Sequence, residues 1–221
     1  MRLVGLVLLI TSVGNALAFR PEWGGTWKFW LSLGGPYAAL AALAIYRMWD
    51  EGILRDVFKP KSGDFAIGFG MAVLLLLGTW LGRLAITPNG SEQQVWLAYV
   101  YLMVGDPGVL RASLVLTLTL LVIATCEEIV WRAMVLDQLM QRLGDRRAWP
   151  VSAALYALSL APTLLTLKGP AGLNPLLPLA ALGCGLVWGF AGRLLGRLPP
   201  LILSHMTFSY FVATRFSFPG F

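Results

Sequence analysis

At residues 126–132 the chain reads Cys126-Glu127-Glu128-Ile129-Val130-Trp131-Arg132, which sets three ionisable side chains at the end of a long apolar run. The run begins at Ser113. Charged side chains at membrane depth are costly, so they face a protein interior or a wet cavity and mark function by default. The rest of the chain is interpreted around this segment.

The spacing of the charges predicts different roles for the two carboxylates. Each residue of an α-helix turns about 100°, so Glu128 and Arg132 lie on one face and can pair. Glu127 points about 140° away from Arg132 by the same rotation. We therefore expect the arginine to hold Glu128 and to leave Glu127 available for chemistry.

The composition is that of an integral membrane protein. Of the 221 residues, 57% are hydrophobic and 13% charged, whereas a soluble domain carries about 25% charged residues. The length fits one bundle of about seven helices at about 20 residues per span. We predict an all-α, polytopic membrane helix bundle that forms a single domain over residues 1–221. The net charge of +6 is interpreted as cytoplasmic anchoring and not as a nucleic-acid footprint.

Apolar runs separated by polar or Gly/Pro-containing segments predict the seven spans. These cover residues 3–19, 29–46, 65–86, 113–142, 151–167, 176–194 and 201–216. The first run has features of a cleavable signal peptide, but we expect it to be retained. An apolar patch at residues 95–103 is too short to cross a bilayer and is predicted to be re-entrant or interfacial. Pro162 is expected to kink the fifth span.

Basic residues predict the orientation. Loops 47–64, 142–147 and 193–197 carry four, three and two of them, and with seven spans all three loops fall on one side. The positive-inside rule then puts the N-terminus in the cytoplasm and the C-terminus outside. On this topology Glu127 lies about 21 Å into the fourth span, and His205 about 7 Å into the seventh from the opposite side. The carboxylates and the histidine are therefore predicted at a similar depth.

The Glu-Glu-x-x-x-Arg pattern resembles the first motif of the CPBP family of glutamic intramembrane proteases. That family includes CAAX-prenyl endopeptidases, bacteriocin-immunity proteins and bacterial C-terminal sorting-signal proteases. The segment at 201–209, Leu-Ile-Leu-Ser-His-Met-Thr-Phe-Ser, is similar to the family's last motif, His-x-x-x-Asn, with Ser209 in place of asparagine. The resemblance covers a catalytic core of about residues 113–209.

The middle family motif, Phe-x-x-x-His, is matched only in outline. Tyr156 replaces the phenylalanine, and Leu160 stands where the histidine belongs. His205 is the single histidine of the chain, so no realignment supplies another. Tyr156 either donates a proton in place of the absent histidine or only packs. An apolar Leu160 beside the site predicts a live but slow enzyme that Leu160→His accelerates.

The resemblance implies peptide-bond hydrolysis within the membrane. Glu127 would be the general base on a water molecule, Glu128 and Arg132 would orient it, and His205 with Ser209 would donate to the developing oxyanion. No cofactor is implied. No metal site is expected either, because one histidine and two cysteines outside a ligand spacing do not form one.

Three functional hypotheses follow. The first is an intramembrane endopeptidase of the bacterial inner membrane, acting on a membrane protein or peptide substrate within the lipid bilayer, in particular on a C-terminal sorting signal. The second is a non-catalytic binding or immunity protein of the same fold. The third is a small transporter that uses the Glu–Arg pair as a proton or ion relay, although no two-half repeat is evident.

Overall fold

The computed structural model describes residues 2–215 and confirms the predicted all-α membrane bundle. Phe216, the last residue of the predicted seventh span, lies outside the described residues. Within the described range every named element is helical. In chain order these are α1 (Arg2–Ala18), η1 (Pro21–Trp23), α2 (Trp27–Asp50), α3 (Leu54–Phe58), α4 (Asp64–Ile86), α5 (Gln94–Val104), α6 (Pro107–Ala112), α7 (Leu114–Glu128), η2 (Ile129–Leu136), α8 (Asp137–Leu143), α9 (Asp145–Ser159), α10 (Thr163–Thr166), α11 (Leu176–Leu195) and α12 (Pro199–Arg215).

Five helical segments of the described chain are long and apolar enough to cross a membrane. They are Trp27–Asp50, Asp64–Ile86, Leu114–Leu143, Asp145–Thr166 and Leu176–Leu195. The first and last predicted spans correspond to α1 and α12, which are shorter at 17 residues each. The patch predicted as re-entrant or interfacial forms α5, an 11-residue helix.

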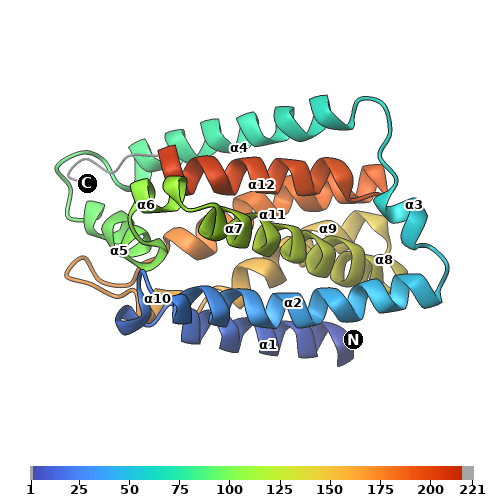
Figure 1. Ribbon diagram of the computed structural model, residues 1–221, viewed down its shortest axis with the longest axis horizontal. Helices are drawn as coiled ribbons and strands as arrows, with labels where there is room; N and C mark the ends of the chain where they lie inside the picture. The colour runs from blue at the N-terminus through green and yellow to red at the C-terminus, as the bar shows by residue number, and fades with distance from the viewer. Residues whose placement is uncertain (1, 216–221) are drawn as a thin grey trace.

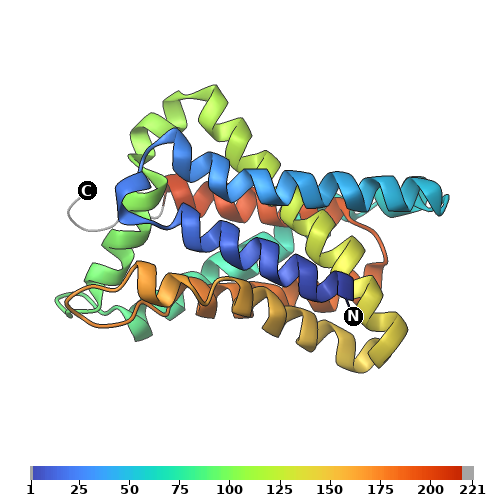
Figure 2. The same ribbon diagram turned by 90° about the horizontal axis from the view of Figure 1, so that it is seen from below.

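The middle of the bundle is one 30-residue helical segment, Leu114–Leu143, made of α7, η2 and α8. Helices α2, α9, α11 and α12 pack around it. α4 lies along α12, and α1 lies along α2 with a further contact to α9 (Figures 1 and 2). The predicted charged segment therefore runs through the centre of the protein.

The three basic loops lie at the same end of the bundle as the N-terminus (Figures 1 and 2). Two of them touch there, because the backbone N–H of Leu198 donates to the carbonyl of Val57 at 2.9 Å. Arg197 also forms an ion pair with Asp64 at the start of α4. The three basic loops thus lie at one end of the bundle, and α12 ends at the opposite one, as the predicted topology has them.

The fifth predicted span is broken rather than kinked. α9 ends at Ser159, and the short α10 follows after Pro162. Proline lacks a backbone N–H and its ring clashes with the preceding turn, so a helix usually stops before it. The break places a helix end inside the bundle, one turn beyond Tyr156.

Candidate functional site

The helix that carries the predicted site changes its geometry directly after Glu128. α7 is α-helical up to that residue, and the next eight, Ile129–Leu136, are π-helical. Hydrogen bonds of a π-helix close over five residues rather than four, and such segments are rare and frequent at functional sites. The 100° rotation assumed from the sequence therefore does not hold beyond Glu128, and the directions of Trp131 and Arg132 follow the wider turn.

Glu128 is the fully buried carboxylate. Its side chain is 1% exposed, and its Oε2 lies 3.5 Å from Nε of Arg132, whose side chain is 2% exposed. Its Oε1 lies 2.8 Å from Nδ1 of His205 on α12. The pairing of Glu128 with Arg132 agrees with the spacing argument, and the histidine is a second partner that the spacing does not reveal.

Within the described residues Glu127 forms no ion pair with Arg132, but it is not without a partner. The hydroxyl of Tyr156 on α9 donates to its Oε2 at 2.6 Å. Nε2 of His205 lies 3.8 Å from the same oxygen, and the side chain is 13% exposed. The expectation that Glu127 is left free is corrected in this respect: it is the more accessible carboxylate, yet a tyrosine hydroxyl already holds it.

His205 joins the two carboxylates. One ring nitrogen faces Glu128 and the other faces Glu127. The indole of Trp188 on α11 stacks on the imidazole, with ring centroids 4.0 Å apart and planes 24° from parallel. The indole N–H donates to the hydroxyl of Ser204, the residue before His205, at 3.0 Å. The imidazole is thus held on one face and at Nδ1, whereas Nε2 faces Glu127 beyond hydrogen-bond distance.

Tyr156 is held from both sides of its ring. The guanidinium of Arg132 lies 5.4 Å from the ring centroid, in cation–π range. The indole of Trp131 packs against the ring at 5.3 Å between centroids. Arg132 therefore touches both halves of the site, through Glu128 on one side and through the Tyr156 ring on the other.

Two further predicted positions lie less centrally. Ser209 is one turn beyond His205 on α12 and partly buried, and within residues 2–215 its hydroxyl forms no side-chain hydrogen bond. Leu160 follows the last residue of α9 and packs against buried apolar side chains of the bundle. The structure brings together Glu127, Glu128, Arg132, His205 and Tyr156, which form the charged cluster.

The sequence reasoning left two contributors out of the site. From the sequence, Tyr156 is either a proton donor or a packing residue, and no role is predicted for Trp188. The tyrosine had a signal, because it occupies a position of a family motif. Trp188 had none, since its stacking depends on how α11 packs beside α12.

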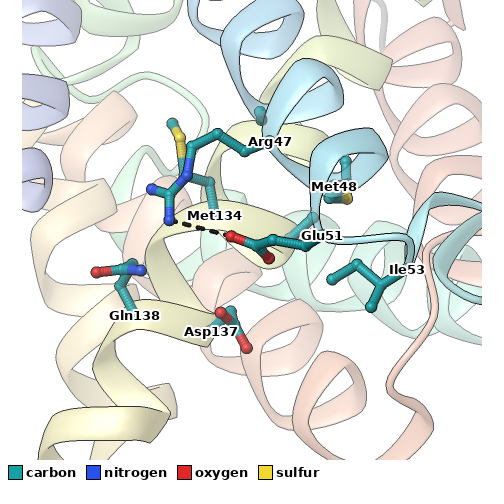
Figure 3. Close-up of a pocket in the computed structure, with 9 residues that line it drawn as sticks. Arg47, Met48, Glu51, Ile53, Met134, Asp137 and Gln138 are labelled. Carbon is teal, nitrogen blue, oxygen red and sulfur yellow. Dashed lines mark hydrogen bonds and ion pairs between the residues drawn. The ribbon is translucent and has the colours of Figure 1, made fainter.

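A separate polar pocket lies at the basic end, between the end of α2 and the start of α8 (Figure 3). Arg47 and Glu51 form an ion pair at 3.3 Å on one wall, and Asp137 and Gln138 form the other. Its volume of about 20 Å³ has room for about one water molecule. None of the candidate site residues lines it.

Comparison with known proteins matches part of the chain to one family. Residues 110–211 match a family described as "Rce1-like: Type II CAAX prenyl endopeptidase Rce1-like". No curated protein and no solved structure matches the chain. The matched range includes every residue of the charged cluster, and it agrees with the CPBP resemblance. Among the described residues, no group of three or more His, Cys, Asp or Glu side chains could hold a metal ion.

Proposed function

We propose that this multi-pass membrane protein, whose residues 110–211 match the Rce1-like family, is an intramembrane endopeptidase of the CPBP type that uses water activated by Glu127. One observation carries the proposal. A single carboxylate oxygen, Oε2 of Glu127, receives the Tyr156 hydroxyl at 2.6 Å and lies 3.8 Å from Nε2 of His205. Acid, base and a third polar group therefore converge on one partly exposed point inside a membrane bundle.

The geometry around Glu127 suits water activation. Two atoms 3.8 Å apart can both lie about 2.8 Å from a third atom, so one water can hydrogen-bond to Glu127 and His205 together. The carboxylate takes a proton from that water as it attacks the peptide carbonyl, and it returns the proton to the amide nitrogen as the C–N bond breaks. The Tyr156 hydroxyl meanwhile keeps Oε2 in a fixed direction.

Glu128 and Arg132 act on the histidine. With the Nδ1 proton of His205 held on Glu128, Nε2 is the nitrogen that can exchange a proton with water or donate to the oxyanion. The ion pair with Arg132 holds Glu128 in the orientation that this requires. Ser209 supplies a second hydroxyl one turn away on the same helix, and oxyanion donors of this kind are each worth a few kcal/mol in well-studied hydrolases.

The substrate is a membrane-associated protein, and we propose a C-terminal sorting signal in a bacterial inner membrane. His205 is six residues after Pro199, about 9 Å along α12 from the basic end. A scissile bond must therefore reach a shallow depth below the cytoplasmic face. A short motif followed by an apolar span and a basic tail meets that requirement, since the tail stays in water while the span enters the bilayer.

One observation favours a second candidate, a non-catalytic binding protein of the same fold. Leu160 stands at the position of the family histidine and packs with apolar neighbours, so the site lacks one polar group of the family pattern. In this alternative the charged cluster holds a helix of a partner and hydrolyses nothing.

A cleavage assay separates the two functions. Purified protein in liposomes is incubated with two internally quenched peptides, one ending in a sorting-type signal and one ending in a prenylated cysteine motif. We expect slow cleavage of the first peptide by the wild type, and faster cleavage by Leu160→His, because a positioned acid–base group contributes about 100-fold or more. If both proteins bind the peptides but leave them intact, the binding function replaces the protease.

A further inference from the structure

The N-terminal helix α1 lies outside the family-matched region, yet it is packed into the bundle. Its buried positions form one stripe, made of Val4, Val7, Thr11, Gly14, Asn15 and Ala18. The stripe faces α2 and α9. At Gly14, α1 and α2 approach so closely that a Cβ atom on Gly14 would lie 2.9 Å from the ring of Pro36 on α2. Two members of the stripe are polar, Thr11 at 0% and Asn15 at 1% exposure.

The end of α9 contains a carbonyl that its own helix does not satisfy. Three residues after Ser159 the chain has Pro162, which carries no N–H. Four residues after it, the N–H of Thr163 donates to Leu160 instead. The carbonyl of Ser159 therefore has no donor along its own chain, and a buried carbonyl without a donor costs free energy.

Asn15 supplies the missing donor. Its side-chain amide donates to the Ser159 carbonyl at 2.9 Å, across 144 positions of sequence. The hydroxyl of Ser159 in turn donates to the carbonyl of Tyr156 at 2.7 Å. A helix end inside the membrane is thus completed by a side chain from α1, and the completed turn is the one that carries Tyr156.

A second contact links this corner to the charged cluster. The Tyr37 hydroxyl on α2 lies beside Asn15 and Ser159, and it accepts from the indole N–H of Trp131 at 3.3 Å. Trp131 packs against the Tyr156 ring. Both routes from α1 therefore end at Tyr156, whose hydroxyl is the donor to Glu127.

We propose that Asn15 is a positioning residue, through which α1 holds the end of α9 so that the Tyr156 hydroxyl stays on Glu127. The inference rests on the proposed function for its catalytic consequence. Its structural content, the dependence of the Tyr156–Glu127 contact on Asn15, stands without it. The site is then completed by a helix from outside the family-matched residues.

Kinetics test the catalytic consequence. Asn15→Ala should lower kcat by about 10- to 100-fold with KM changed less than about twofold, because small misplacements of catalytic groups are costly. Thr11→Ala is the matched control. Its hydroxyl is equally buried on the same stripe but bonds back to Val7 of its own helix, so kcat should be unchanged. In a Tyr156→Phe background Asn15→Ala should have no further effect, since both changes remove one coupled contact.

A readout without catalysis tests the contact itself. The chain has six tyrosines, and the ring Cζ signal of Tyr156 in ¹³C-tyrosine NMR can be assigned with Tyr156→Phe. We expect that signal to shift in Asn15→Ala and to stay in place in Thr11→Ala. An inactive wild type with this pattern would end the proposed function and leave the positioning role standing. A Tyr156 signal that is the same in Asn15→Ala and wild type would overturn the positioning role.

A compensating change covers the case in which Asn15→Ala does not fold. Pro162→Ala restores a backbone N–H and lets α9 continue, so the Ser159 carbonyl gains a donor from its own chain. The double variant should recover folded protein and a Tyr156 signal closer to that of wild type. A double variant that folds no better than Asn15→Ala would overturn Ser159 as the target of Asn15.

Discussion

Two ion pairs of this protein each join an arginine to a carboxylate, but they differ in how many of their polar atoms have hydrogen-bond partners. At the basic end, Arg197 contacts Asp64 through Nε and Nη2 at 2.6–3.2 Å, and the backbone N–H of Lys61 adds a hydrogen bond at 2.8 Å. In the centre, Arg132 and Glu128 meet at a single distance of 3.5 Å. Within the described residues, Nε and Nη2 of Arg132 and Oε2 of Glu128 have no hydrogen-bond partner.

The difference indicates what each pair does. Asp64 and Arg197 join the start of α4 to the connection between α11 and α12. Their polar groups bond to each other and to the nearby backbone. The central pair retains unused hydrogen-bonding capacity in a buried place, where each unsatisfied group costs about 1–3 kcal/mol. Such groups call for an explanation, and a catalytic role is one. We infer that the pair Asp64–Arg197 stabilises the fold, and that the pair Glu128–Arg132 is part of the site.

Breaking the central pair should have the largest effect. Arg132→Ala, or Glu128→Gln, leaves a buried charge without its partner, which costs about 3–5 kcal/mol of folding free energy. Denaturation in detergent, followed by circular dichroism, measures the loss. If both variants unfold at the wild-type midpoint, the two residues do not form the pair that the structure describes.

Removing the Tyr156 hydroxyl should have the next largest effect, on rate rather than on folding. Tyr156→Phe deletes one hydrogen bond to a charged group, worth about 1.5–3 kcal/mol, so cleavage should slow by about 10- to 100-fold. Steady-state rates on the sorting-type peptide measure it. Tyr46→Phe, at an exposed site on α2, is the control. Equal rates for all three proteins would reduce Tyr156 to a packing residue.

The comparison between the pairs is sharpened by Asp64→Asn. This variant weakens the ion pair with Arg197 at the basic end and changes no residue of the charged cluster. We expect the melting temperature to fall, because Asp64 is buried and paired with Arg197. The cleavage rate per folded molecule should stay within about twofold, because among the described residues neither of the two forms a hydrogen bond or ion pair with the charged cluster. A strong fall in rate at unchanged melting temperature would mean that this end of the bundle also takes part in catalysis.

The smallest expected effect is that of a chelator. Zinc sites take three or four ligands from His, Cys, Asp or Glu, and among residues 2–215 no three such side chains are placed to hold a metal ion. We expect the cleavage rate after strong chelation and desalting to equal that of the untreated protein. Loss of activity that returns on adding zinc would contradict this.

Local spacing predicted the parts of the site that belong to one helix. The pair Glu128–Arg132 follows from its separation of four residues, and the helical spans follow from the apolar runs. The predicted depths place His205 near the two carboxylates, but they do not indicate that the imidazole faces both. The π-helical turn was not predictable, because it depends on how the neighbouring helices hold the segment and not on residue type.

Contacts between helices that are distant in sequence could not be predicted either, because they also depend on how the helices pack. Nothing in the order of residues indicates that Trp188 stacks on His205 or that Asn15 reaches Ser159. The polar pair Thr11 and Asn15 in an apolar segment was the available signal for the second contact, since two polar residues four apart lie on one buried face.

The central claim is that two adjacent carboxylates divide their work, and Glu127→Gln tests it most directly. The variant keeps the size and most contacts of the side chain but cannot accept a proton from water. We predict that it melts within a few degrees of wild type and cleaves the sorting-type peptide at least about 100-fold more slowly. A Glu127→Gln protein that cleaves at the wild-type rate would contradict the account.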